Sequence, residues 1–210
     1  MLKTTSKPER RSARDRLLTA AQELFYEEGI NTVGIDRVIE RAGVAKASLY
    51  DCFGSKEELI RAYLVARHEA RRARMQDSLA RYATPKERLL GVFDVQGELA
   101  AESGFRGCAF VRASAEARSG SSVKDVCVDS RAWLRGLFVE LAQEAGAARP
   151  EILAEQFVLL YDGASVSAQM DGNTGAPASA RAVASLLLDA ELTPSPPRSS
   201  QTSGRIKRHA

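Results

Sequence analysis

Side chains that can contact a nucleic acid gather between residues 46 and 56 of this chain. Lys46, Ser48 and Tyr50 supply hydrogen-bond donors, and Lys56 supplies a second ammonium group. Donors of these types satisfy phosphate oxygens and the edges of bases. Asp51 would repel phosphate, but a carboxylate can accept a hydrogen bond from cytosine N4. These residue types therefore fit contact with DNA, provided that a rigid element turns them outward.

Two short helices can position these side chains. Apolar residues at positions 35, 38, 39 and 42 fall on one face of a helix, and Gly43 then ends it. A second helix is predicted over 46–53, with Leu49 and Phe53 inward, and its outward side would carry Lys46, Ala47, Ser48, Tyr50 and Asp51. A short helix held across a tight turn by another helix is a common way to enter the major groove. An ordinary helical hairpin would show the same spacing.

Flanking helices and charges favour the DNA-binding interpretation. Apolar residues on one face predict a helix over 14–28, and the S-x-x-E form of residues 55–58 predicts a capping box that begins another helix. The segment from Lys3 to Arg16 holds six Lys or Arg and two acids, a local charge of +4. Such an arm could neutralise phosphates, although a solvated terminus is the alternative explanation.

The segment from about residue 14 to residue 64 resembles the DNA-binding domain of the TetR family of bacterial transcriptional regulators. The resemblance rests on LFYEEG at 24–29, AGVAKASLYDCFGSKEEL at 42–59 and the L-Y-x-x-F-x-S-K-E-x-L signature within it. It implies an all-helical fold, a C-terminal domain that dimerises and binds a small ligand, and phosphate contacts by Tyr50 and Lys56. Lys46, Ala47 and Ser48 are then the candidates for base contacts, and Arg37 for either a base or a phosphate.

Several positions depart from the family pattern. Gly34 and Ala45 stand where a hydroxyl residue is usual, Ile39 stands where many relatives have alanine, and Asp51 and Cys52 replace aromatic or histidine residues. These differences leave the target DNA sequence open without removing the helices.

Composition excludes several other classes of protein. The 210 residues carry a formal charge of only +3, so DNA affinity has to come from a local basic surface. Three cysteines without a CxxC pair fit free thiols in a reducing cytoplasm, where we expect the protein to act. The only histidines are His68 and His209, and no nucleophile–base setting, metal-ligand cluster or phosphate-binding glycine loop is recognisable. We therefore expect no enzyme, no cofactor, no metal and no membrane span.

The rest of the chain predicts further helices, which gives an all-α fold of about nine helices. We expect a basic N-terminal arm over 1–9, a three-helix DNA-binding domain with a helix-turn-helix over 10–58, and a larger helical ligand-binding and dimerisation domain over 59–192. Residues 193–210 are rich in Pro, Ser, Thr and basic residues, and their composition predicts a disordered basic tail.

The ligand pocket is predicted from buried polar and aromatic residues of the second domain. Gln96 is the first candidate because it falls on the apolar face of its helix. The other candidates that could line the same cavity are Phe93, Cys108, Phe110, Trp133, Phe138, Gln156 and Tyr161. This mixture suggests a largely apolar ligand, although each aromatic could equally belong to the core. The basic cluster Arg67, Arg71, Arg72 and Arg74 is expected to form a solvated face.

The last two long helices are the candidates for a dimer interface. Small residues allow a close approach between helices, and an apolar stripe marks the final helix; the predicted interface residues are Gly163, Ala164, Ser167, Val183, Leu186 and Leu187. The same residues could instead pack within one subunit.

Together these features predict a one-component transcriptional regulator, most simply a repressor. A homodimer would bind a pseudo-palindromic double-stranded DNA operator and would be released by a small-molecule effector acting through the helix at 56–79. A helical dimeric adaptor, or an activator without ligand-induced release, is the alternative.

Overall fold

A computed structural model describes residues 11–192, and within that range the chain forms nine α-helices and no strand. The helices are α1 (Ala13–Glu28), α2 (Ile35–Ala42), α3 (Lys46–Phe53), α4 (Lys56–Leu79), α5 (Pro85–Ala100), α6 (Ala109–Glu116), α7 (Ser122–Glu144), α8 (Pro150–Met170) and α9 (Ala176–Leu192). The predicted all-α fold is confirmed. The expected basic arm over 1–9 and the expected tail over 193–210 lie outside the described residues.

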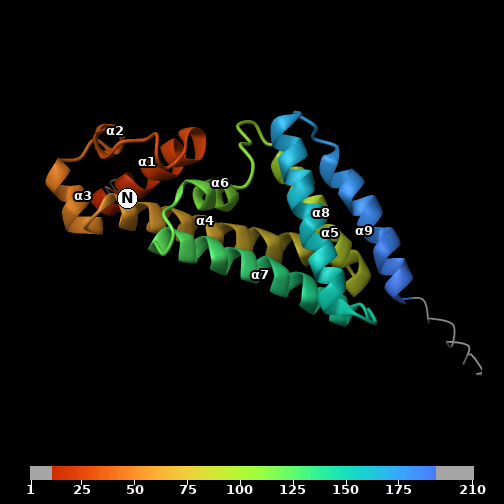
Figure 1. The fold of residues 1–210 in the computed structure, drawn as a ribbon. Coiled ribbons are helices and arrows are strands. Elements are labelled where there is room, and N and C mark those ends of the chain that lie inside the picture. Colours follow the sequence, from red (N-terminus) through yellow and green to blue (C-terminus); the bar gives the residue numbers. More distant parts are fainter. Residues whose placement is uncertain (1–10, 193–210) are drawn as a thin grey trace, which may run out of the picture.

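The helices are arranged around the long pair α4 and α7, which run side by side (Figure 1). Helices α1, α2 and α3 gather at one end of α4, and α5, α8 and α9 pack at the other end (Figure 1). The short helix α6 lies over α4 between these two groups, near α1 (Figure 1). Helix α4 therefore connects the three N-terminal helices with the rest of the molecule.

Local signals explain where the N-terminal helices begin and end. Gly43 ends α2 in the left-handed conformation with φ 60°, and its N–H donates to the carbonyl of Glu40 at 3.0 Å. The Ser55 hydroxyl accepts from the Glu58 N–H at 3.1 Å, as half of the predicted capping box requires. The Glu58 carboxylate pairs with Arg61 at 2.9 Å. Both halves of a capping box are present at Thr84 and Glu87, at the start of α5.

Two apolar cores hold the described residues together. The first joins α1–α3 to the start of α4, and includes the fully buried side chains of Leu17, Leu49 and Leu59. The second lies among α5, α7, α8 and α9, around an aromatic cluster of Phe93, Phe138 and Phe157. The first core continues past residue 58, into α6 and the first turns of α7. The N-terminal helices are thus packed directly against elements of the predicted second domain.

A search of residues 11–192 finds no helix with the length and apolar character needed to cross a membrane.

Candidate nucleic-acid interface and ligand cavity

Helix α3 presents one buried side and one open side. Leu49 is fully buried and fixes the helix to the first core. The predicted contact residues Lys46, Ala47, Tyr50 and Asp51 are exposed, and Ser48 is half-buried. Tyr50 keeps 45% of its surface exposed although it is a large aromatic residue. The structure therefore brings these predicted residues together on one accessible face.

Two of the predicted basic contacts are engaged in surface ion pairs. The Lys46 Nζ lies 3.1 Å from Asp36 Oδ1, and this hydrogen bond raises the pKa of Lys46. Arg37 donates two hydrogen bonds, of 2.5 and 2.8 Å, to the Glu28 carboxylate, and these bonds raise the pKa of Arg37. Exposed pairs of this kind contribute little stability and are easily exchanged. Both cations stay charged and can transfer to a phosphate at small cost.

Lys56 occupies a more covered position than Lys46 or Arg37. It is half-buried in the first turn of α4, where free N–H groups favour an anion. Burial lowers the pKa of Lys56, and the charge of Glu116 on α6 opposes that shift. The phosphate contact predicted for Lys56 stays a prediction. The charge of its ammonium group also interacts with the Glu116 carboxylate on α6.

Arg16 has a role that the sequence did not reveal. Its Nε donates to the carbonyl of Ala42 at 2.8 Å, and its Nη2 donates to the carbonyl of Gly43. These carbonyls belong to the last turn of α2, where backbone acceptors lack helical partners. The guanidinium group thus ties α1 to the turn before α3, although we expected it to act within a phosphate-neutralising arm. Unsatisfied carbonyls before Gly43 are the only signal that could have indicated this role.

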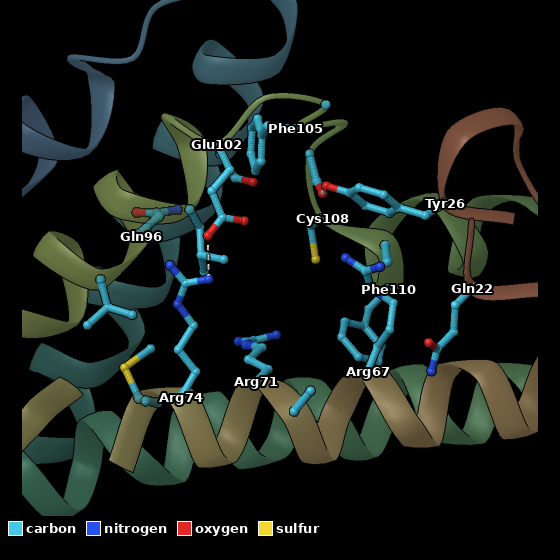
Figure 2. A pocket seen from close by; sticks show the side chains of 18 of the residues that line it. Gln22, Tyr26, Arg67, Arg71, Arg74, Gln96, Glu102, Phe105, Cys108 and Phe110 are labelled. Atoms are coloured by element: carbon cyan, nitrogen blue, oxygen red, sulfur yellow. Dashed lines mark hydrogen bonds and ion pairs between the residues drawn. The ribbon is translucent and has the colours of Figure 1, made fainter. Parts of the chain in front are cut away.

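A cavity of about 380 Å³ lies among α1, α4, α5, α6 and α8, and Figure 2 shows it from close by. Four of the predicted ligand-binding residues line it, namely Gln96, Cys108, Phe110 and Tyr161. Gln96 is buried and donates from Nε2 to the Tyr161 carbonyl at 2.6 Å. Volumes of this size suit small organic ligands.

The other four predicted pocket residues lie elsewhere. Phe93 and Phe138 face each other in the aromatic cluster of the second core, with ring centroids 5.8 Å apart. Trp133 lines a second hollow, of about 470 Å³, between α4 and α7. Gln156 is exposed on α8. Leu153 and Phe157 mark the buried side of this helix, and Gln156 faces away from that side. Their part in ligand binding stays a prediction.

The arginines of α4 depart from expectation. Arg67, Arg71 and Arg74 line the cavity, and only Arg72 of the cluster is exposed. Figure 2 shows Arg74 reaching from α4 toward Glu102, and Arg71 lying on α4 between Arg74 and Arg67. The prediction of a solvated face was therefore wrong for Arg67 and Arg71, whereas Arg74 keeps 36% of its side chain exposed in a surface ion pair with Glu102. Their spacing of four and three residues places them on one helical face, which was a signal available in the sequence.

Helix α6 and the segment before it link the cavity to the N-terminal helices. The Tyr26 hydroxyl accepts from the Arg106 N–H at 2.9 Å and donates to the Gly107 carbonyl at 3.2 Å. Arg112 donates to the Tyr26 carbonyl at 2.6 Å. Tyr26 belongs to α1 and also lines the cavity, so one residue of the N-terminal group contacts the same space as Gln96 and Arg71.

An apolar surface remains open on α8 and α9. Its large exposed residues are Leu159, Val166, Met170, Val183 and Leu186, of which Leu159 and Leu186 are each 70% exposed. Among the predicted interface residues, Gly163 is also exposed, and Ser167 and Leu187 are half-buried. Ala164 is 5% exposed because it packs into the second core of its own subunit.

Comparison with known proteins agrees with this arrangement. Residues 17–63 match the profile of bacterial regulatory proteins of the tetR family. The transcriptional activator FasR of Mycolicibacterium smegmatis is 47% identical over 51 residues, which is 24% of this chain and 23% of FasR. The transcriptional repressor KstR2 of Mycobacterium tuberculosis is 35% identical over 82 residues, which is 39% of this chain and 41% of KstR2. These matches span less than half of either relative.

A solved structure extends the similarity over nearly the whole fold. The structure of sav143 from Streptomyces avermitilis, assigned as a TetR transcriptional regulator, superimposes with a TM-score of 0.78 at 32% identity. The match covers 86% of this chain and 98% of the other. The chain therefore belongs to the TetR family of bacterial regulatory proteins.

Proposed function

We propose that this protein is a one-component transcriptional regulator that represses a promoter as a homodimer and releases it when a small ligand binds. One observation carries the proposal. Tyr26 of α1 lines the cavity, and α1 is tied through Arg16 to the turn that precedes the exposed helix α3. A ligand that displaces α1 from its position at the cavity would therefore also displace α3, whose open face is proposed to contact DNA.

The DNA contact is assigned to the open face of α3. Lys46, Ala47 and Ser48 lie at its leading end and would meet base edges, while Tyr50 and Lys56 would meet phosphates. Arg37 would give up its exposed pair with Glu28 to reach the DNA. Asp51 would either accept from cytosine N4 or disfavour other bases at that position.

The homodimer is assigned to the open apolar surface of α8 and α9. Exposed leucines on two neighbouring helices favour burial against the same surface of a second copy, since a twofold interface is self-complementary. Two reading helices related by that axis would match half-sites about 34 Å apart, or a multiple of that spacing.

Ligand control requires that the ligand prefer the state that does not fit DNA. The cavity wall is shared by α1, α4, α5 and α6, so a ligand that changes the spacing between α1 and α6 would also move α2 and α3. The network around Tyr26 is the contact that would carry this movement.

Selection of bound fragments from genomic DNA tests the proposal, followed by mobility-shift titration of the selected sequence. We expect a pseudo-palindromic sequence whose affinity falls steeply as salt rises, because lysine and arginine contacts release counterions. A protein that enriches no sequence at low ionic strength would contradict the proposal and would favour a helical adaptor.

Repression and activation are separated by transcription in vitro from the selected promoter. FasR, which is 47% identical over 51 residues, is an activator, and KstR2 is a repressor. We expect transcript levels to fall when this protein is added.

A further inference from the structure

The cavity carries more positive charge than its own residues neutralise. Three arginines and one glutamate line it, which leaves a formal charge of +2. Arg74 is paired with Glu102 at 2.5 Å. Arg67 lies over the ring of Tyr26, with its guanidinium carbon 3.8 Å from the ring centroid. Neither Arg67 nor Arg71 is paired with an acid among the lining residues, and Arg71 differs from Arg67 because its buried Nε and Nη2 have no hydrogen-bond partner among the described residues.

Aromatic rings contact the faces of the Arg71 guanidinium group, but two N–H groups along its edge have no hydrogen-bond acceptor among the described residues. The rings of Phe110, Trp133 and Tyr161 lie 5.1 to 5.8 Å from its guanidinium carbon. Its Nε and Nη2 are buried and have no hydrogen-bond partner among the described residues. Aromatic faces attract the cation but accept none of its in-plane hydrogen bonds. Arg71 as a whole is half-buried, but buried N–H groups of a cation without a partner are costly, so these two donors favour an anion that can reach them.

The geometry of the unsatisfied atoms limits the chemistry of that anion. Nε and Nη2 form one edge of the guanidinium group, and two parallel N–H bonds along such an edge match the two oxygens of a carboxylate or phosphate. Figure 2 shows the Arg71 side chain standing in the middle of the cavity floor. The anionic group of a ligand is therefore expected at that point.

Part of the remaining wall is apolar and favours an apolar body. Met75, Val95, Leu99 and Phe105 line the same cavity. The buried Gln96 Oε1 also lacks a hydrogen-bond partner, so one further polar group can be accepted there. A ligand that is charged throughout would make no favourable contact with these apolar side chains. A neutral apolar ligand would leave the N–H groups of Arg71 without a hydrogen-bond acceptor.

The imidazole of His68 also lies near the charge of Arg71, although Asp129 and Glu69 oppose the effect of the arginines on its pKa. Burial lowers the pKa of this imidazole, and the charges of Arg71 and Arg72 lower it further. Its ring packs against Phe110 and Trp133, the rings that also surround Arg71.

We propose that the effector is an amphipathic anion, with an apolar body in the cavity and a carboxylate or phosphate group held by Arg71. This inference rests on the proposed ligand control, and it narrows the effector class from the largely apolar ligand that the sequence suggested.

Calorimetric titration of the full chain with three probes of one chain length tests the charge requirement. Decanoate, decyl phosphate and decanamide share an apolar body and differ in the head. We expect at least one anion to bind at least about tenfold more tightly than the amide, because the anion would form a charge-assisted pair with Arg71. Whether decanoate or decyl phosphate binds more tightly identifies the preferred head. Equal binding of all three, or binding of none, would overturn the proposal.

Matched variants assign the preference to one residue. Arg71→Gln should remove the preference for the anion while the affinity for decanamide stays within about twofold. Arg72→Gln is the control, because Arg72 is the next residue of α4 and is exposed. It should keep the preference. Arg71→Lys keeps the charge and loses the two-bond edge, so it should show an intermediate preference and provides a second test if Arg71→Gln does not fold. An unchanged preference in Arg71→Gln would overturn the assignment.

Operator binding by the same samples separates this inference from the proposed function. If an anion binds through Arg71 but leaves operator affinity unchanged, the cavity assignment stands and ligand control fails. If the anion preference is absent while the operator is still bound, the DNA-binding function stands and the effector class is wrong.

Discussion

Tyr50 stands on the open side of α3, one residue after the buried Leu49. A large aromatic side chain is usually covered, and the packing of the described residues does not explain why that of Tyr50 is exposed. A hydroxyl group at this place can donate to a phosphate, while its loss should leave the core intact.

Tyr50→Ala is expected to weaken operator binding by about tenfold, since a hydrogen bond to a charged group contributes about 1.5 kcal/mol. Mobility-shift titration measures the effect. Thermal unfolding should be nearly unchanged because the side chain lies at the surface. Tyr50→Phe keeps the ring and removes the hydroxyl, so an equal loss in both variants assigns the effect to the hydroxyl group. Unchanged affinity in Tyr50→Ala would remove this residue from the interface.

His68 makes stability depend on pH. Its folded pKa lies below the ordinary value of 6.5, first through burial and then through Arg71 and Arg72, with Asp129 and Glu69 opposing. Above pH 6.5 the imidazole is neutral in both states, and its contribution to stability is fully present. As the pH falls below 6.5, the unfolded chain binds a proton more readily than the folded chain, so stability decreases until the folded pKa is passed.

We therefore expect the melting temperature of the native protein to fall between pH 7.5 and pH 5.5 by more than that of His68→Gln. Scanning calorimetry at several pH values measures both. Parallel profiles for the two proteins would show that His68 does not contribute to the pH dependence.

At the scale of elements, the end of α6 contacts the residues that follow α1, close to Gly29. Gly29 has φ +96°, and a Cβ added there would lie 2.9 Å from Glu116 Oε1. The Glu116 carboxylate accepts from the Asn31 N–H at 2.8 Å, and its carbonyl accepts from Asn31 Nδ2 at 3.0 Å. A side chain at position 29 would require the Glu116 carboxylate to shift from this position.

Gly29→Ala should lower the free energy of unfolding by about 1–3 kcal/mol, because an L residue is strained at that φ and the contact with Glu116 is too close. Urea unfolding measures the change. Gly136→Ala is the matched control, since Gly136 is helical and a Cβ there would meet nothing within 4 Å. It should raise stability by up to about 1 kcal/mol. A neutral Gly29→Ala variant would mean that α6 and α1 are not held in the described contact.

At the scale of the whole molecule, the proposed dimer places the open surface of α8 and α9 between two copies, so that the α3 helices of both would act together on DNA. One N-terminal group can contact one half-site, and affinity for a twofold operator depends on linking two of them. Leu159 on α8 and Leu186 on α9 are each 70% exposed on this surface.

Leu186→Glu should convert the dimer into a monomer, because a buried unpaired carboxylate costs several kcal/mol at an apolar interface. We expect operator affinity to fall by at least about a hundredfold. Light scattering after size exclusion gives the mass, and mobility shift gives the affinity. Val128→Glu introduces the same charge at a valine of α7 that is 58% exposed, and should leave both unchanged. A dimeric Leu186→Glu protein would place the interface elsewhere.

The sequence alone was sufficient for the helices and for the outward residues of α3. Apolar spacing, Gly43 and the Ser55 cap act within a few residues, so the helices over 35–42 and 46–53 were predicted with their observed bounds. Gln96 was also predicted as a buried polar group, because its place on an apolar helix face is a local property.

The cavity was decided by tertiary structure. One face of α4 carries Arg67, Arg71 and Arg74. The exposure of this face to water depends on α5, α6 and the segment between them, because these elements cover it although they lie up to about forty residues away in the sequence. Phe93 and Gln96 lie within one turn of α5, yet Phe93 enters the aromatic core and Gln96 lines the cavity, because helix crossings decide which side of a buried face meets which neighbour. Periodicity specifies a face, and only packing specifies what that face meets.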